Sequence, residues 1–370
     1  MASKDQEWVY YHAGGVRGAR PVLRGTDAKE TFESIPVIDV SGIFSPDLED
    51  RKKVATQIGK ACREVGFFYA QNHSVPSDLI EETFEAIKKF FALPREDKME
   101  VHLHKNAALR GYEPLFETNL EGAGRGDMKE AFLIGQDASE PEQSAPLLPP
   151  PSTTALNSWP SAYPEFRPAV YRYYAQAMAL ARKLIRTFAL ALDLPETYFD
   201  AMTSFPMIHF RMLHYPPQEA VDARNIGIGA HTDYTFFTLV QQEHISGLQV
   251  LNANGIWVDA KPIPGTYVVN VGDFFARVTN NRFTSTVHRV LNLTGEERYS
   301  MPFFFAPNPE AVVEVVPSCR GEGEEEKKGI VAGEYFMERL RAARWRHPSN
   351  QGKPPPKVLD VATGEVVLQA

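Results

Sequence analysis

The chain has 370 residues, 43% of them hydrophobic, and a formal net charge of −8 from 47 acidic and 39 basic side chains. This length and composition allow a substantial buried core in one large domain or two. The acidic balance argues against a broad basic surface for nucleic acid, and no apolar run is long enough to cross a bilayer. The only cysteines, Cys62 and Cys319, are far apart in sequence, which favours free thiols. We therefore expect a cytoplasmic protein with neither nucleic acid nor a membrane as partner.

The first 204 residues predict a surface arm, residues 1–33, followed by a mainly helical region, residues 34–204. The segment 34–43 is typical of a short strand. Apolar side chains then recur at helical spacing in three segments, the first with Ser45 as its expected N-cap and Gly66 as its end. The expected buried faces are Leu48, Val54, Ile58 and Val65; Ile80, Phe84, Ile87 and Phe91; and Tyr174, Met178, Ala181, Ile185, Phe188 and Leu192. Between the last two helices, the proline-rich segment 137–154 predicts a surface loop, either a lid or a connector.

Residues 205–310 predict an antiparallel sandwich or barrel, because short β-prone runs alternate with turn residues every 8 to 15 positions or so. Residues 311–370 predict an acidic loop, a closing helix over 333–346 and a tail. The fold class expected is mainly β with flanking helices. We expect the whole chain to form one integrated unit.

A metal site is predicted by the segment GIGAHTDYTFFTLV, residues 227–240. On a strand, residues i and i+2 point to the same face, so His231 and Asp233 would project together. His288, in STVHRVLN, is the candidate third ligand from a neighbouring strand. Two histidines and one aspartate form the facial arrangement of non-haem Fe(II) oxygenases, with zinc as the competing metal. Either residue of the His231–Asp233 pair alone would be read as a turn cap or a surface pair.

A carboxylate clamp is predicted beyond the metal site. The segment RVLNLTGEERYSMPFFF suggests a hairpin turning near Gly295, so that Arg298, Ser300, Pro302 and Phe304 share one face of the returning strand. Arg298 would then lie roughly 7 to 10 Å from the level of His288, about the length of a small dicarboxylate. A guanidinium and a hydroxyl are the groups that a buried carboxylate needs. A structural ion pair is the alternative role for Arg298.

Together these motifs resemble the iron(II)/2-oxoglutarate-dependent dioxygenases, in the subgroup named for isopenicillin N synthase. The segments HTD at 231–233, VHRV at 287–290 and RYSMPFFF at 298–305 are similar to the His-x-Asp, distal-His and Arg-x-Ser elements of that family. Further similarity extends from about residue 34 to residue 346. Segments near residue 216 and at the C-terminal helix also resemble microbial branches that include the ethylene-forming enzyme.

The resemblance implies a double-stranded β-helix, or jelly-roll barrel, that uses Fe(II), 2-oxoglutarate and O2. His231, Asp233 and His288 would hold iron, and Arg298, Ser300 and Tyr215 would hold 2-oxoglutarate. The family often has an amide where this chain has Leu213, so one hydrogen bond to the co-substrate could be lacking. Tyr215 could instead be a core residue. The implied reaction oxidises an unactivated C–H bond of a small molecule, by hydroxylation, desaturation or cyclisation, and turns 2-oxoglutarate into succinate and CO2.

The sequence leaves substrate contacts and rival functions open. Phe304 shares the expected inward face with Arg298, and five further residues lie in stretches that approach the substrate in relatives: Arg110, Tyr112, Phe132, Arg211 and Phe237. The rival functions are an iron oxidase that works without 2-oxoglutarate, a non-catalytic binding barrel and a zinc hydrolase. We expect a small-molecule substrate, plausible in specialised metabolism, and a monomer or weak homodimer.

Overall fold

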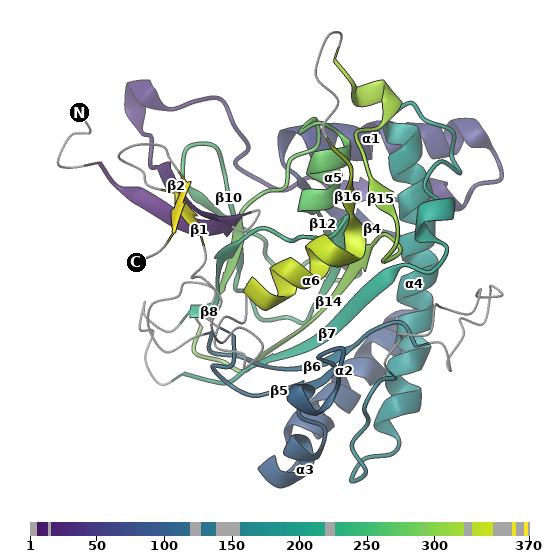
Figure 1. Cartoon of the computed structure of the whole chain (residues 1–370), viewed down its shortest axis with the longest axis vertical. Coiled ribbons are helices and arrows are strands. Elements are labelled where there is room, and N and C mark those ends of the chain that lie inside the picture. The colour runs from purple at the N-terminus through teal and green to yellow at the C-terminus, as the bar shows by residue number, and fades with distance from the viewer. Residues whose placement is uncertain are drawn as a thin grey trace.

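The computed structural model describes residues 6–13, 16–118, 127–137, 156–218, 226–292, 294–321, 328–342, 357–359 and 366–368. Within these residues, two curled sheets of eight strands each form the centre of the molecule, and helices cover one of them (Figure 1). No helix among the described residues combines the length and the apolar character needed to cross a bilayer. The mainly β class with flanking helices is therefore confirmed.

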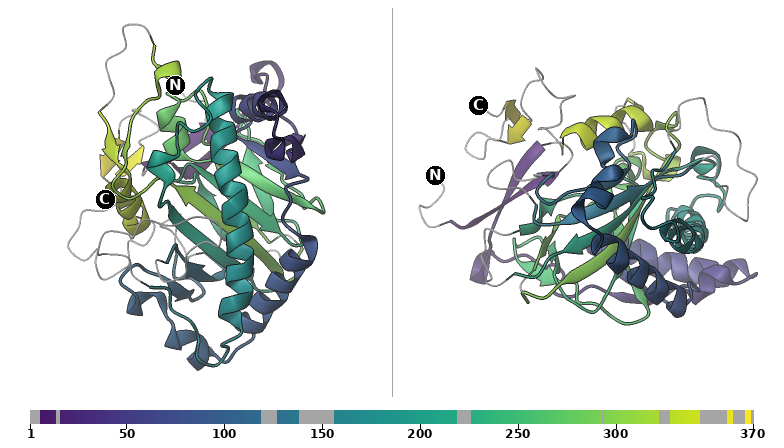
Figure 2. Two further views of the ribbon diagram at one scale, coloured as in Figure 1. Left: turned by 90° about the vertical axis from the view of Figure 1, so that its right-hand side faces the viewer. Right: turned by 90° about the horizontal axis from the view of Figure 1, so that it is seen from below.

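The first sheet, sheet A, carries the strand that leads into the metal motif. Its strands, in spatial order, are β11 (Trp257–Asp259), β10 (Leu248–Leu251), β13 (His288–Leu291), β8 (Ile226–His231), β1 (Trp8–Ala13), β2 (Val16–Pro21), β17 (Lys357–Leu359) and β18 (Val366–Leu368). The N-terminal ribbon β1–β2 therefore does more than lie over the surface, because it extends sheet A and joins β8 at the pair His12–His231. Strand β17 adds to β2 in parallel, so both ends of the chain meet on this side of the barrel (Figures 1 and 2).

The second sheet, sheet B, faces sheet A across the barrel interior. Its strands, in order, are β3 (Val37–Asp39), β4 (Phe67–Gln71), β12 (Thr266–Val271), β9 (Phe237–Gln242), β14 (Arg298–Ala306), β7 (Met207–Tyr215), β6 (Glu130–Ile134) and β5 (Gly111–Glu113). Four of these strands come from the region 34–204, which the sequence describes as mainly helical. That region therefore supplies half of a barrel sheet as well as its helical cover.

Helices cover the outer face of sheet B. They are α1 (Leu48–Glu64), α2 (Ser77–Phe91), α3 (Arg95–Glu100), α4 (Phe166–Ala191) and α5 (Asp273–Val278), with α6 (Ala332–Ala342) nearer the open end of the barrel, after a small hairpin of β15 (Val312–Val313) and β16 (Ile330–Val331). Figure 2 shows the long helix α4 lying across the strands. The apolar faces predicted for α2 and α4 are buried in one large core with the outer side chains of sheet B.

The first helix starts later than predicted. The side chain of Asp47, not Ser45, caps α1 by accepting a hydrogen bond from the Glu49 N–H at 2.9 Å. Ser45 Oγ instead accepts from the Asp47 N–H at 3.1 Å, which leads the chain into the cap. Gly66 follows the helix with φ +76°, and a Cβ there would lie 2.2 Å from the Thr284 carbonyl oxygen. Glycine at 66 is thus required by both backbone conformation and space.

Two predictions about the strands near the metal motif were wrong. His231 ends β8, and Asp233 lies in the turn before β9, so the two side chains converge across a turn rather than along one strand. Strands β13 and β14, predicted as a hairpin, belong to different sheets: β13 pairs with β8 and β10, and β14 pairs with β7 and β9. Gly295, with φ +75°, does turn the chain, but the turn carries it from one sheet to the other.

Several predicted segments lie wholly or partly outside the described residues. The proline-rich loop is described only at Asp137, the acidic segment lacks residues 322–327, and the closing helix is described as far as Ala342.

We predict that Phe188→Ala destabilises the protein by about 3–5 kcal/mol, because Phe188 on α4 is fully buried and its ring contacts those of Phe237, Phe275 and Phe283. Chemical denaturation followed by fluorescence measures the change. Lys183→Ala, at an exposed position earlier on α4, should change the stability by less than about 0.5 kcal/mol. A similar small effect at Phe188 would contradict the packing described for α4.

Candidate metal centre and carboxylate clamp

Three side chains inside the barrel converge on a point where a metal ion could bind. Suitable ligand atoms of His231, Asp233 and His288 all lie within 4.8 Å of one another. The two histidines are cross-strand partners on β8 and β13. Each Nε2 lies 3.6 Å from Asp233 Oδ1. Sequence reasoning therefore found a triad that the fold does bring together.

Backbone contacts orient both imidazoles toward the centre of the triad. His231 Nδ1 lies 2.8 Å from the Gly229 carbonyl oxygen, and His288 Nδ1 lies 3.1 Å from the Thr286 carbonyl oxygen. A carbonyl can only accept, so each Nδ1 carries the proton and each Nε2 presents its lone pair. The arrangement of two nitrogen donors and one carboxylate fits an Fe(II) ion that keeps open coordination positions.

Two residues that the sequence did not single out hold the Asp233 carboxylate. Thr238 on β9 and Asn270 on β12 both donate hydrogen bonds to Asp233 Oδ2, Asn270 at 2.7 Å, and the two are cross-strand partners. Oδ1 is thereby left to face the histidines. In the sequence, Thr238 and Asn270 stand out only because each lies on a β-prone run. Their neighbours on the same runs share that property, so the sequence alone could not identify them.

The pKa values in the triad follow from burial and mutual contact. Burial alone would raise the pKa of Asp233, but His288, His231 and Asn270 hold it well below its usual range. Burial, reinforced by His231, lowers the pKa of His288 to about 4. Burial would also lower the pKa of His231, but its contact with Asp233 outweighs burial and raises it. The resulting pattern, an anionic carboxylate beside a neutral His288, suits metal coordination.

A buried cation lies at the other end of the same interior. Arg298 on β14 is 1% exposed, and its guanidinium stacks on the Tyr215 ring at 4.8 Å. It donates to three neutral acceptors: the Ile245 carbonyl at 3.2 Å, Ser300 Oγ at 3.3 Å and Gln242 Oε1 at 3.1 Å. Burial lowers the pKa of Arg298. Among the described residues no carboxylate pairs with this guanidinium, so the pocket can accept an anion.

The clamp residues are held in place by strand pairing. Arg298 is the cross-strand partner of Tyr215, and Ser300 is the partner of both Leu213 and Gln242. The Tyr215 hydroxyl is buried close to Ser300 and Arg298 without a well-formed hydrogen bond to a described residue, and burial raises its pKa. Leu213 packs in the apolar lining of the barrel. Its aliphatic side chain offers no hydrogen bond there.

The six predicted substrate contacts fall into different environments. Phe304 is only partly buried and is the cross-strand partner of Thr238, so it lies on the inner face near the triad. Arg211 lies on the same inner side and donates to Glu113 Oε1 at 2.8 Å. Arg110 donates to Asn157 Oδ1 at 3.2 Å, and Asn157 lies three residues after the end of the proline-rich segment.

The other three predicted contacts, Tyr112, Phe132 and Phe237, belong to the core between sheet B and the helices. Tyr112 donates to Glu130, and the Phe132 ring packs on Phe90 at 4.7 Å. Phe237 packs on Phe188. Direct substrate contact by these three residues stays a prediction, and their packing does not favour it.

A group of buried charges near the triad was missed by sequence reasoning. Lys129 and Glu113 are 2% and 0% exposed and form an ion pair, with Thr118 and Arg211 also bonded to Glu113. The signal for this group was the charged pair Lys129–Glu130 directly before the apolar run of a buried strand. A buried charge pair of this kind is costly to form, which points to a polar function for this part of the interior.

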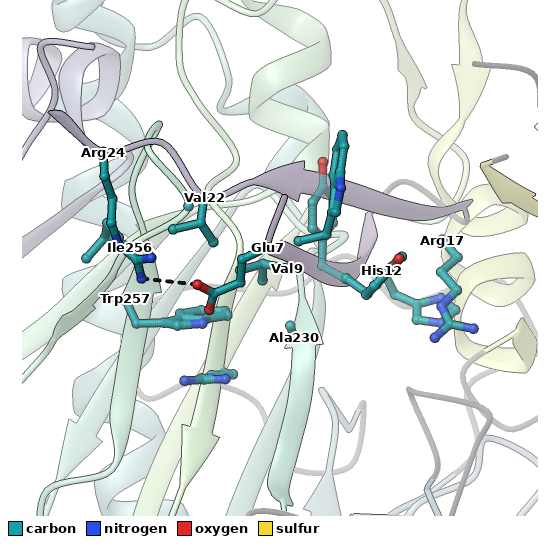
Figure 3. A pocket seen from close by; sticks show the side chains of 14 residues that line it. Glu7, Val9, His12, Arg17, Val22, Arg24, Ala230, Ile256 and Trp257 are labelled. Atoms are coloured by element: carbon teal, nitrogen blue, oxygen red, sulfur yellow. Dashed lines mark hydrogen bonds and ion pairs between the residues drawn. The ribbon is translucent and has the colours of Figure 1, made fainter. Parts of the chain in front are cut away.

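A separate cavity lies on the opposite face of sheet A from the triad. It has a volume of about 500 Å³, and Figure 3 shows it between the N-terminal ribbon and Trp257, with Glu7 paired to Arg24 at its edge. Ala230, next to His231 in the chain, forms part of its floor. The cavity is therefore on the outside of the barrel, and none of the three triad residues lines it.

We predict that Thr238→Val weakens metal binding about 10- to 100-fold, because valine keeps the shape of the side chain but cannot hold Asp233 Oδ2. Anaerobic titration with Fe(II) or Co(II) measures the affinity. Thr197→Val, at an exposed position outside the barrel, serves as the matched control and should bind like the wild type. Unchanged affinity in Thr238→Val would contradict a role for this hydroxyl in orienting the ligand.

Comparison with known proteins agrees with this geometry. Residues 35–162 match the N-terminal domain described as that of a non-haem dioxygenase in morphine synthesis, and residues 207–307 match the 2OG-Fe(II) oxygenase superfamily. A 2-oxoglutarate-Fe(II) type oxidoreductase of Emericella nidulans, hxnY, is 38% identical over 325 residues, which cover 84% of this chain and 92% of that protein. A homoarginine-6-hydroxylase of Oryza sativa is 34% identical, over 84% of this chain and 97% of that protein.

Solved structures give the same result. A full-length Neurospora crassa protein, crystallised in complex with alpha-KG and thymine, has a TM-score of 0.73 and 31% identity, and the match covers 85% of this chain and 98% of that one. The jelly-roll fold, the His-Asp-His group and these relatives agree. The chain belongs to the family of Fe(II)- and 2-oxoglutarate-dependent oxygenases.

Proposed function

We propose that His231, Asp233 and His288 hold the catalytic Fe(II), and that Arg298, Ser300 and Tyr215 bind the distal carboxylate of 2-oxoglutarate. The observation that carries the proposal is the pairing of these two sites in one interior. A carboxylate between two imidazoles lies at one end, and a guanidinium without an anionic partner among the described residues lies at the other. The proposal assigns the two ends of one dicarboxylate to these two sites, the keto acid to the metal and the distal carboxylate to the clamp.

The reaction converts substrate, 2-oxoglutarate and O2 into oxidised product, succinate and CO2. Fe(II) with its keto-acid co-substrate supplies the oxidising chemistry when bound. The chain's own residues bind and orient. Thr238 and Asn270 fix the ligand carboxylate, and Arg298 with Ser300 fixes the co-substrate. The apolar lining around Leu213 and Val268 excludes water.

The substrate we propose is a small polar organic molecule that contacts Phe304 and Arg211. Phe304 is the partly exposed residue of β14 and can pack against a carbon framework, while Arg211 can donate to an oxygen. Relatives named as homoarginine-6-hydroxylases, and the Neurospora crassa protein bound to thymine, act on or bind small nitrogen compounds. Hydroxylation is the outcome that the hydroxylase names favour over desaturation and cyclisation.

An oxidase that works without 2-oxoglutarate is the remaining enzymatic alternative. In that case Arg298 would hold a carboxylate of the substrate itself. Production of one succinate per oxidised substrate separates the two mechanisms. The 2-oxoglutarate mechanism is favoured because the Neurospora crassa protein, at 31% identity, carries alpha-KG.

We further propose a cytoplasmic monomer or weak homodimer. Cys62 and Cys319 are both buried and free, as expected in a reducing compartment. Burial raises the pKa of the Cys62 thiol, which makes it inert toward disulfide exchange. Size-exclusion chromatography with light scattering measures the oligomeric state.

We predict that anaerobic Fe(II)-loaded protein develops a weak visible charge-transfer band on addition of 2-oxoglutarate, and that Arg298→Ala requires at least about 30-fold more 2-oxoglutarate to reach it. Removal of a buried partner of a carboxylate costs about 2 kcal/mol or more, which corresponds to this factor. Arg289→Ala is the matched control, because Arg289 stacks on Trp257 at 4.0 Å in the separate cavity outside the barrel.

The control should give the wild-type titration. Bound iron without a band in the wild type would contradict the 2-oxoglutarate assignment and favour the oxidase. If Arg298→Ala and Arg289→Ala required the same concentration of 2-oxoglutarate to develop the band, the result would contradict the role of Arg298 in the clamp but not the binding of 2-oxoglutarate.

A further inference from the structure

Asp127 lies beside the metal-bearing strand, just before β6. Its Oδ1 accepts a hydrogen bond from the Gly229 N–H at 3.3 Å, and the neighbouring Met128 N–H donates to the Ile226 carbonyl at 2.9 Å. Strand β1 reaches β8 only at His231, so the segment containing Asp127 occupies the next part of that edge. The Asp127 carboxylate is therefore fixed at Gly229, which precedes the proposed iron ligand His231 by two residues.

The second oxygen of this carboxylate has no hydrogen-bond partner among the described residues. Asp127 is 3% exposed and its Oδ2 is buried. Lys129 does not satisfy this oxygen; its ammonium is bonded to Glu113 and Thr118 instead. A buried acceptor without a donor costs about 1–3 kcal/mol, and more when it is charged. An oxygen fixed in this state needs an external donor.

The unused oxygen lies beside a group of charges that faces the interior of the barrel. Ala131 and Leu133, two and four residues beyond Lys129, line that interior. Glu113 and Arg211, the cross-strand partners of Ala131 and Leu133, lie on the same face. The Asp127 N–H joins this group by donating at 2.8 Å to the carbonyl of Thr118, whose hydroxyl donates to Glu113. Its bond to the Gly229 N–H, two residues before His231, places Asp127 between the triad and the buried charges of β5 and β6.

A complementary donor lies in the same group. Arg211 gives Nη2 to Glu113, while its Nε is buried without a partner among the described residues. Lys129 and Arg211 are both bonded to Glu113, and Thr118 accepts from both Lys129 and the Asp127 N–H, so these residues form one hydrogen-bonded group. This group thus combines an unused acceptor, Asp127 Oδ2, with an unused donor, Arg211 Nε, among the described residues. An N–H group next to a carbonyl would satisfy both.

We propose that Asp127 is a specificity-determining residue that accepts a hydrogen bond from an amide-type N–H of the substrate, whose carbonyl is bound by Arg211. The substrate class is then a small amide, lactam or ureide, with its N–H close to the carbon that is oxidised. This assignment rests on the proposed function. It adds to that function the chemical group that the pocket recognises.

The test uses two probes that differ in one donor, 2-piperidone and 1-methyl-2-piperidone. Each is titrated anaerobically into protein loaded with Fe(II) and 2-oxoglutarate, and binding is followed by calorimetry and by the change in the visible band. We expect the wild type to bind 2-piperidone at least about tenfold more tightly, since the methylated lactam leaves the Asp127 oxygen unpaired.

The variant Asp127→Asn separates hydrogen bonding from steric fit. Its amide oxygen can keep the Gly229 bond, and its NH2 group replaces the free acceptor, so the preference for 2-piperidone should disappear. Asp78→Asn, an exposed carboxylate at the start of α2, should keep the preference. Equal affinity of the wild type for both lactams, undetectable binding of both included, would overturn the proposal.

A preference that survives in Asp127→Asn would overturn it too, because the methyl group would then be rejected by its size. Failure of the proposed function gives a different result. In that case no visible band forms with 2-oxoglutarate, before any lactam is added.

Discussion

The carboxylate of Asp233 is the group on which the rest of the site depends. Its Oδ2 is bonded to Thr238 and Asn270 of sheet B, and its Oδ1 faces His231 and His288 of sheet A. One side chain therefore joins the inner faces of both sheets. A buried carboxylate is costly unless it is paired and hydrogen-bonded, so these contacts favour closure of the barrel around this group in one register. Metal geometry and fold are specified by the same contacts.

Polar and apolar side chains occupy different parts of the barrel interior. Charged or hydrogen-bonding groups gather at the triad, at Arg298 and around Glu113, whereas Leu213, Val250 and Val268 belong to the apolar lining. Desolvated charges interact strongly, since little water screens them. A carboxylate entering near Arg298 would find a cation already oriented by Gln242 and stacked on Tyr215. Such preorganisation lowers the cost of binding a co-substrate.

Short-range patterns in the sequence predicted the helices and the chemical groups well. The buried faces of α2 and α4, the His-Asp-His group and the burial of Arg298 follow from periodicity and residue type. Long-range pairing was harder to predict. Nothing local distinguishes a hairpin from a turn that carries the chain to another sheet, so β13 and β14 were paired wrongly. The roles of Thr238 and Asn270 depend on cross-strand register, which no single segment encodes.

Strand β1 near the start of the chain and helix α6 toward its end meet at the turn that carries Asp233. On one side, the Thr232 N–H donates to the His12 carbonyl of β1 at 2.9 Å. On the other, the ring of Phe336 on α6 packs on Tyr234 at 5.2 Å. The turn cannot be fixed by a ladder of its own, because it lies between β8 and β9. Within the barrel region, the Asp273 N–H restricts it by donating to the Asp233 carbonyl at 2.7 Å. Strand β1 and helix α6 add contacts from segments that a search confined to residues 205–310 would omit. Ordering of the metal ligands is thus coupled to the docking of β1 and α6, over 300 residues apart in the chain.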